Sequence, residues 1–249
     1  MKLVTLNTWG GAAGASIIDF FKKYSDTDIF LLQEIYHHAT DLTAWDETNR
    51  RELFEEIKQV LPNHVGYFAP SQSNEFGLAA FAKDSLTVKE EGHVFVYRWQ
   101  DAMEGGKGDG AGKTLGRNLQ FLHITSEDRD ITVLNFHGLW NGGGKFDSDD
   151  RLEQSKKILD FAQTLPKDFI LAGDFNLRPD TQSLLMLEKQ LGLRNLVKEY
   201  AITSTRTSHY TKPEKFADYV LVSKDIRVND FKVLPDEVSD HAPLYLEFE

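Results

Sequence analysis

The 249-residue sequence contains no cysteine and no long, uninterrupted apolar run. Without cysteine there is neither a disulfide nor a thiolate metal site, so any metal site must use oxygen or imidazole ligands. No segment has the pattern of a signal peptide or a membrane span, and residues 2–6 already read as a strand. We therefore expect a cytoplasmic protein without stable membrane association.

Basic residues are scarce relative to acidic ones. The sequence has 28 Lys and Arg against 39 Asp and Glu, a net charge of -11. This balance argues against a broad basic surface for nucleic acid, although a local basic groove or a bound metal would still attract phosphate. Neither a linker nor a repeat divides the chain, so we expect one domain over residues 1–249 and a monomer.

The hydrophobic pattern predicts a mixture of strands and helices. The expected helices cover residues 16–24, 49–61, 151–165 and 181–191. The expected strands cover residues 3–6, 28–32, 76–82, 86–99, 119–125, 131–136, 169–172, 216–222, 226–233 and 242–248. Because strands outnumber helices and the two kinds mix, we predict an α/β protein with two packed sheets and helices outside.

One segment, residues 105–114, is rich in glycine. It nearly matches a phosphate-cradling loop, but that pattern requires a glycine where Lys107 stands. We interpret it as a flexible surface loop, with a lid that contacts the substrate as the alternative.

Polar residues stand at the ends of many of the apolar runs. Residues 169–172 lead into Gly173-Asp174-Phe175-Asn176, and Asp174 and Asn176 would share one face of an extended chain. This single pattern is also that of an ordinary turn, but its repetition along the chain favours a functional site. The strand-end residues are Asn7, Glu34, Glu75, His137, Asp174, Asn176, Asp218, Asp240 and His241.

The residue types in this set indicate a metal site with proton chemistry. Five carboxylates brought together would raise each other's pKa unless a cation intervened. Carboxylate and amide oxygens suit Mg²⁺, Mn²⁺ or Ca²⁺ better than Zn²⁺. The two histidines would supply proton transfer near neutral pH. Taken singly, each residue has an ordinary alternative: Asn7 and Asn176 could cap turns, and His241 could be a satisfied polar residue.

The motifs that contain these residues resemble those of the endonuclease/exonuclease/phosphatase superfamily, which has a deoxyribonuclease-I-like fold. They occur in the expected order: Leu6-Asn7, Leu32-Gln33-Glu34, Asn135-Phe136-His137, Gly173-Asp174-Phe175-Asn176, Ala217-Asp218-Tyr219 and Ser239-Asp240-His241. The resemblance covers essentially the whole chain. It implies a four-layer α/β sandwich of two packed mixed β-sheets flanked by helices.

The resemblance also implies which residues hold the metal and move the proton. Glu34 would be the principal ligand of Mg²⁺ or Mn²⁺, Asn7 would help it, and Asp240 would be a further carboxylate on the metal side. His241, paired with Asp218, would be the general base or the orienting group for the attacking water. A carboxylate in that position fixes the imidazole tautomer and stabilises its protonated form.

The remaining residues would act on the phosphate and the leaving group. By the same resemblance, Asp174 would hold the nucleophile or a second metal, and Asn176 would donate its amide N–H to a phosphate oxygen. His137, oriented by Glu75, would stabilise or protonate the leaving group. Arg117 would add a phosphate contact; an exposed, solvated arginine is the alternative.

We therefore predict a Mg²⁺- or Mn²⁺-dependent hydrolase of phosphate esters. A phosphodiesterase or nuclease is favoured, with nucleic acid as one candidate partner. A phosphatase of a small soluble phosphoester and a catalytically idle phosphate-binding module are the alternatives. His137 stands where abasic-site endonucleases carry tyrosine, which argues against that activity. Trp9 stands where several members place a second small acid or amide.

Overall fold

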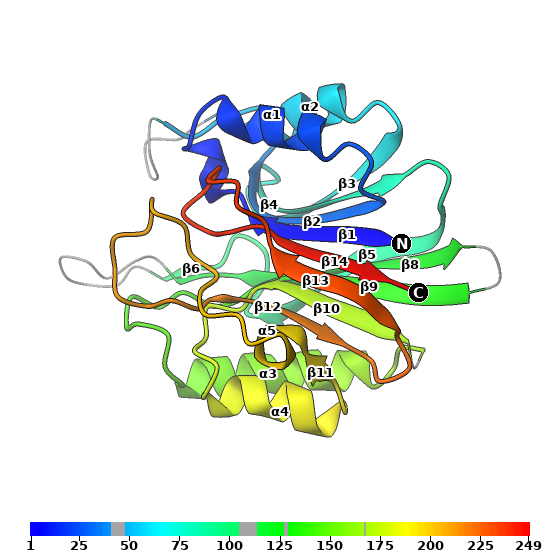
Figure 1. Ribbon diagram of the computed structural model, residues 1–249. Helices are drawn as coiled ribbons and strands as arrows, with labels where there is room; N and C mark the ends of the chain where they lie inside the picture. The colour runs from blue at the N-terminus through cyan, green and yellow to red at the C-terminus, as the bar shows by residue number, and fades with distance from the viewer. Residues whose placement is uncertain (41–47, 105–113, 127–128, 167) are drawn as a thin grey trace.

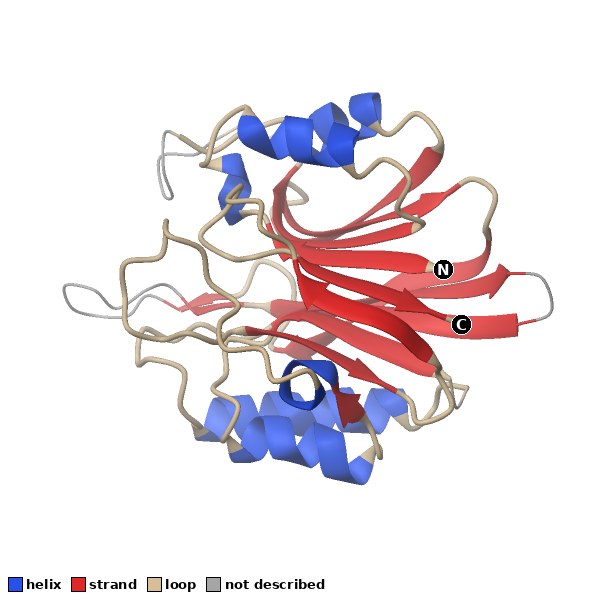
Figure 2. Ribbon diagram, in the orientation of Figure 1, coloured by secondary structure: helices blue, strands red, loops and turns tan. Residues whose placement is uncertain are grey.

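A computed structural model describes residues 1–40, 48–104, 114–126, 129–166 and 168–249. The glycine-rich loop predicted at residues 105–114 falls, except for its last residue, outside the described part of the chain. Two six-stranded sheets pack face to face and helices cover their outer faces (Figure 1). Colouring by secondary structure makes the four layers visible (Figure 2). None of the described helices is both long enough and apolar enough to span a bilayer.

The first sheet carries the N-terminal strands and both C-terminal ones. In spatial order its strands are β13 (Val228–Val233), β14 (Leu244–Phe248), β1 (Lys2–Asn7), β2 (Ile29–Tyr36), β4 (Phe76–Lys83) and β3 (His64–Gln72). Only β1 and β2 pair in parallel. Helices α1 (Ser16–Lys23) and α2 (Leu53–Val60) lie over its outer face (Figure 1).

The second sheet is built from the middle of the chain. In spatial order its strands are β11 (Arg194–Asn195), β12 (Asp218–Val222), β10 (Phe169–Asp174), β9 (Arg129–His137), β8 (Arg117–Ser126) and β5 (Thr87–Tyr97). Only β9 and β10 pair in parallel. Helices α3 (Asp149–Ala162) and α4 (Gln182–Gln190) and the single turn α5 (Leu196–Glu199) flank it.

The main core lies between the two sheets. Leu3 and Leu31 of the first sheet and Val133 and Leu171 of the second belong to one buried apolar cluster. A second cluster fills the space between the first sheet and its helices. The α/β class and the four-layer sandwich predicted from the sequence are thus confirmed.

Strand β3 is the main element that the pattern did not predict. Gly66 and Pro70 interrupt its sequence, and both disfavour a strand interior. The strand lies at the edge of its sheet, where a proline costs no ladder hydrogen bond. The short elements β6 (Met103–Glu104), β7 (Thr114–Leu115) and η1 (Trp9–Gly11) were also not predicted.

Candidate active site

Strand pairing brings the polar strand ends to one edge of the sandwich. Asp174, the last residue of β10, is paired in register with His137 at the end of β9 and with Asp218 at the start of β12. Asn7 ends β1 and Glu34 lies near the end of β2, which runs parallel to β1. Residues far apart in sequence therefore meet at this edge.

A bulge directs Glu34 into the site. The register between β2 and β4 shifts between Leu32 and Ile35, and Glu34 has a φ of 59°. Bulges re-aim side chains, and a non-glycine residue in the left-handed region is a form of strain that is common at functional sites. Trp9 and Asn176, which also line the cavity, have φ values of 51° and 54°.

Glycine is required just before Asp174. Gly173 has a φ of 140°, and a Cβ atom there would lie 2.0 Å from the carbonyl oxygen of Phe136. This close approach of β9 and β10 explains why glycine precedes the aspartate in the motif.

His241 is held by a chain of hydrogen bonds. Its Nδ1 lies 2.8 Å from Oδ1 of Asp218, and Oδ2 of Asp218 accepts a 2.9 Å hydrogen bond from the Thr205 hydroxyl. Burial alone would lower the pKa of His241, but the carboxylates of Asp218 and Asp174 outweigh it and raise this pKa. The Nε2 atom of His241, 3.7 Å from Asp174 Oδ2, is left to face the cavity.

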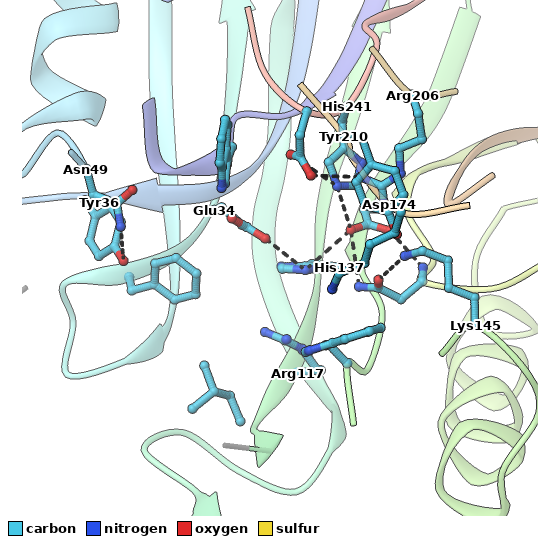
Figure 3. Close-up of a pocket in the computed structure, with 17 residues that line it drawn as sticks. Glu34, Tyr36, Asn49, Arg117, His137, Lys145, Asp174, Arg206, Tyr210 and His241 are labelled. Atoms are coloured by element: carbon cyan, nitrogen blue, oxygen red, sulfur yellow. Dashed lines mark hydrogen bonds and ion pairs between the residues drawn. The ribbon is translucent and has the colours of Figure 1, made fainter. Parts of the chain in front are cut away.

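Asp174 lies at the centre of the polar network (Figure 3). Its Oδ1 accepts the backbone N–H of Asn176 at 2.8 Å, and its Oδ2 accepts side-chain amide hydrogens of Asn7 and Asn176 at 3.0 and 3.2 Å. Burial alone would raise the pKa of Asp174, but the charges of His241 and Lys145 outweigh it and hold this pKa well below its usual range. The buried carboxylate is therefore ionised.

Asn7 does not present the metal-ligand oxygen expected from the sequence. Its Oδ1 accepts the backbone N–H of Trp9 at 3.0 Å. Its NH₂ group instead donates to Glu34 Oε1 and Asp174 Oδ2, both at 3.0 Å. Because a backbone N–H can only donate, the contact with Trp9 fixes this amide orientation. In this structure the Asn7 amide therefore lies between the carboxylates of Glu34 and Asp174 and donates a hydrogen bond to each.

Glu75 does not orient His137. Its carboxylate accepts hydrogen bonds from the backbone N–H and the hydroxyl of Thr40, at 3.0 and 2.8 Å, and Glu75 is not among the residues that line the cavity. The neighbours of His137 Nε2 are instead Glu34 Oε1 and Asp174 Oδ2, each at 3.7 Å. The sequence match that suggested this role covered only Asn74 and Glu75. In the structure, Glu75 immediately precedes β4, and its carboxylate contacts Thr40 instead of His137.

The surroundings of His137 favour its neutral form. Burial, together with the charge of Arg117, lowers its pKa well below the ordinary value, although Asp174 opposes this shift. A neutral imidazole can donate one N–H to a leaving oxygen, which fits the stabilising part of its predicted role.

The carboxylates fit a divalent cation. The pKa of Glu34 is raised, chiefly by burial and also by the charges of Asp240 and Asp174. Within the described part of the chain, Glu34 forms no ion pair with a lysine or arginine. An incompletely compensated carboxylate facing two others is what a hard oxygen-liganded ion such as Mg²⁺ or Mn²⁺ would neutralise. One ligand atom each of Asp174, Asp218 and His241 lies within 4.8 Å of the others, and Glu34 and Asp240 line the same cavity.

Arg117 is buried rather than solvated. Only 6% of it is exposed, yet its side chain hydrogen-bonds to none of the described residues and its Nε has no partner. Burial lowers its pKa, and only the charges of Glu34 and Asp174 oppose this shift. Figure 3 shows its guanidinium beside His137, in the wall of the cavity. A buried, unpaired guanidinium is poised for an anion.

Three further cations line the cavity and were not predicted. Lys145 Nζ donates a 2.6 Å hydrogen bond to Asn176 Oδ1, and burial lowers the pKa of this lysine. Arg206 pairs with Asp240 at 3.2 Å, and Lys212 Nζ lies 5.3 Å from the ring centre of Trp140. All three lie on irregular segments, so no hydrophobic periodicity in the sequence indicates them. The glycine run Gly142–Gly144 before Lys145 is the one local sequence feature that could have indicated a functional loop there.

The cavity has a volume of about 370 Å³. It is lined by Trp9, Glu34, Tyr36, Asn49, Phe76, Leu115, Arg117, His137, Trp140, Lys145, Asp174, Asn176, Arg206, Tyr210, Lys212, Asp240 and His241. Most of the predicted site residues thus border one space; Asn7 and Asp218 stand behind it and support Glu34, Asp174 and His241.

Comparison with known proteins places this site in a family. A profile described as Endonuclease/Exonuclease/phosphatase family matches residues 4–241, which confirms the resemblance of the strand-end motifs. No curated protein matches the chain in sequence.

Several solved structures are similar to this chain over its whole length. A mannosyl-6-phosphatase from Bacteroides thetaiotaomicron is 20% identical, covers 100% of this chain and 99% of its own, and gives a TM-score of 0.76. A functionally unknown conserved protein from Enterococcus faecalis is 18% identical, with 100% and 99% covered and a TM-score of 0.73. D. rerio TDP2, complexed with a single-strand DNA product, is 14% identical, with 100% and 98% covered and a TM-score of 0.71. At these identities they share the fold.

Proposed function

Because the chain belongs to the endonuclease/exonuclease/phosphatase family, we propose that it is a divalent-metal-dependent hydrolase of phosphomonoesters with a small, uncharged alcohol part. This proposal narrows the substrate class predicted from the sequence. The sequence favoured a phosphodiesterase and kept a phosphatase as the alternative; we now propose the phosphatase. The observation that carries it is the division of charge within the cavity.

Four cationic side chains line the part of the cavity that also holds Asp174 and Asp240. Lys145 and Arg206 lie on the Asp174 side of Glu34 and Arg117 lies below His137, and Lys212 also lines the cavity (Figure 3). Arg117 and Lys212 form no ion pair with an acidic side chain among the described residues. Lys145 donates its hydrogen bond to the uncharged amide of Asn176. This surplus suits the two negative charges of a terminal phosphate better than the one charge of a phosphodiester.

The described residues that line the other half of the cavity carry no formal charge. Tyr36 and Asn49 lie on the opposite side of Glu34 and contact each other, with the Asn49 amide donating to the Tyr36 hydroxyl at 3.2 Å (Figure 3). Trp9, Phe76 and Leu115 complete this uncharged lining. Among the described residues, this lining offers no cationic side chain for the next phosphate of a nucleic acid. The similarity to a mannosyl-6-phosphatase agrees with a neutral alcohol part but establishes only the fold.

The residues then have the following roles in the proposed reaction. His241 Nε2 accepts a proton from the attacking water while Asp218 stabilises the imidazolium. Arg117 and Lys145 bind the phosphate oxygens, and the neutral His137 donates its N–H to the leaving oxygen. Glu34 and Asp240 would hold a divalent ion, which would supply positive charge to neutralise the phosphate.

A substrate panel tests the proposal. Turnover of p-nitrophenyl phosphate, bis(p-nitrophenyl) phosphate, hexose 6-phosphate, hexose 1,6-bisphosphate and single-stranded DNA would be compared with Mg²⁺, with Mn²⁺ and with EDTA. We expect metal-dependent release of phosphate, fastest from the hexose 6-phosphate and slower from the bisphosphate, whose alcohol part is charged. Preferred cleavage of the diester or of DNA would overturn the monoester assignment and restore the phosphodiesterase prediction.

A further inference from the structure

A second group of potential metal ligands lies outside the active-site cavity. His37 lies just beyond the end of β2 and is followed by His38, and Glu52 and Glu55 lie at the start of α2. None of the four is among the residues that line the cavity. We call these four residues the histidine cluster.

The donor atoms of the histidine cluster converge. His37 Nε2 lies 3.3 Å from Glu55 Oε1, and His38 Nδ1 lies 2.7 Å from Glu52 Oε2. One ligand atom each of His37, His38 and Glu55 lies within 4.8 Å of the others. Tetrahedral ligands at bond lengths of about 2.0–2.2 Å are about 3.4 Å apart. The His37–Glu55 spacing already matches this geometry, and the ligand atom of His38 lies within 4.8 Å of both.

The surrounding structure holds the two imidazoles in place. The His37 ring packs against Phe54 and Phe68, with ring centres 4.8 and 5.0 Å away. The two histidine rings lie 4.2 Å apart, and His38 has a φ of 52°, a backbone conformation that few non-glycine residues adopt. This backbone places adjacent side chains on the same side of the chain, whereas in an extended strand they would point to opposite sides.

We propose that His37, His38 and Glu55 bind a transition-metal ion of the Zn²⁺ class, with Glu52 as a further ligand. Imidazole with carboxylate suits Zn²⁺, Co²⁺ or Ni²⁺, whereas Mg²⁺ prefers oxygen ligands alone. The two His–Glu contacts as isolated surface ion pairs would contribute little and would not need the rings to lie side by side. A metal bound here ties the end of β2, three residues beyond Glu34, to α2.

Titration with Co²⁺ as the probe tests this site, since a four-coordinate Co²⁺ ion gives strong visible absorption bands. The titration would be run with excess Mg²⁺ on the wild type, His38→Gln, Glu55→Gln and the control His123→Gln. His123 also has a glutamate neighbour, with Glu90 Oε2 at 3.8 Å, but lies on β8 away from the cluster. Any Co²⁺ bound in the catalytic site is common to all four proteins.

We expect the wild type and His123→Gln to bind one more Co²⁺ than His38→Gln and Glu55→Gln. The visible bands of that ion should be lost in both cluster variants, with a fall in its affinity of about 10-fold or more, because even indirect partners of metal ligands contribute about 10–100-fold. Zn²⁺ should displace the ion and raise the melting temperature of the wild type more than that of either cluster variant. The same stoichiometry and spectrum in all four proteins would refute the site. Circular dichroism would verify that the cluster variants are folded.

Discussion

At the scale of single residues, Arg117 is buried in the cavity wall without a hydrogen-bond partner for its Nε. A buried guanidinium without a partner is costly in the free protein, but it is what an anionic substrate would use. The sequence alone left open whether Arg117 contacts phosphate or is exposed to solvent, because burial of an arginine depends on which segments pack over it. Lys145 and Arg206 were missed for the same reason: they come from loops whose position is set by tertiary contacts.

Replacing this arginine should therefore separate activity from stability. In Arg117→Met we expect kcat/KM to fall about 10–100-fold, since a hydrogen bond to a charged group contributes about 1.5–3 kcal/mol. We expect the melting temperature to rise, because the unpaired buried charge is gone. Steady-state kinetics and thermal unfolding would measure both, with Arg178→Met, at a partly exposed arginine outside the cavity lining, as the control. A fall in both quantities would mean that Arg117 is structural.

His241 permits a second test at this scale. In His241→Ala we expect kcat to fall about 10²–10⁴-fold, the usual range for a general base. Asp218→Asn should also lower kcat, because the 2.8 Å contact to His241 Nδ1 fixes the imidazole tautomer. His209→Ala, which removes an exposed histidine near Trp9, is the control for both variants. An undiminished rate in His241→Ala would remove His241 from the proposed mechanism.

At the scale of elements, the sequence predicted the strands whose ends build the site but not how their residues point. The apolar runs in the sequence predicted strands β2, β9 and β10. The polar residues at the ends of these runs, Glu34, His137 and Asp174, were predicted as site residues. The bulge that turns Glu34 inward depends on pairing with β4 and has no local signal. The hydrogen bond that turns the Asn7 oxygen toward Trp9 likewise exists only in the folded chain.

Helix α4 depends on a residue that lies outside it in sequence. Asp147 accepts hydrogen bonds from the backbone N–H groups of Gln182 and Ser183, at 2.7 and 2.9 Å, and from the Ser183 hydroxyl at 2.6 Å. The side chain of Thr181, the residue before α4, forms no cap. Burial alone would raise the pKa of Asp147, but these hydrogen bonds outweigh it and lower this pKa.

This capping contact predicts a pH-dependent contribution to stability. Asp147→Ala should lower the free energy of unfolding by about 0.5–2 kcal/mol at neutral pH. Because the folded-state pKa is lowered, the advantage of the wild type is fully present above the ordinary aspartate pKa of about 3.9 and is lost as the pH falls through the folded value. Urea unfolding at several pH values would measure it, with Asp180→Ala as the control. An equal loss at every pH would contradict the role of the charge.

At the scale of the whole molecule, a polar contact joins the two sheets beneath the site. Asn135 of β9 accepts a 2.7 Å hydrogen bond from Gln33 Nε2, and its own NH₂ group lies 3.0 and 3.1 Å from the carbonyl oxygens of Leu32 and Ala79. These partners belong to β2 and β4, in the opposite sheet. Of the motif Asn135-Phe136-His137, only His137 was assigned to the site; Asn135 faces the interior.

This contact should couple the stability of both sheets to the active site. Asn135→Leu keeps the volume but removes the donor to the Leu32 and Ala79 carbonyl groups and to Gln120 Oε1. Leaving a buried polar group unsatisfied costs about 1–3 kcal/mol, so we expect a loss of about 3 kcal/mol or more. Because Gln33 precedes Glu34, the affinity for Mg²⁺ should fall as well. Thermal unfolding and Mg²⁺ titration would measure the two effects, with Asn229→Leu, an exposed asparagine on β13, as the control. Lost stability with unchanged Mg²⁺ affinity would mean that the contact holds the sheets together without positioning Glu34.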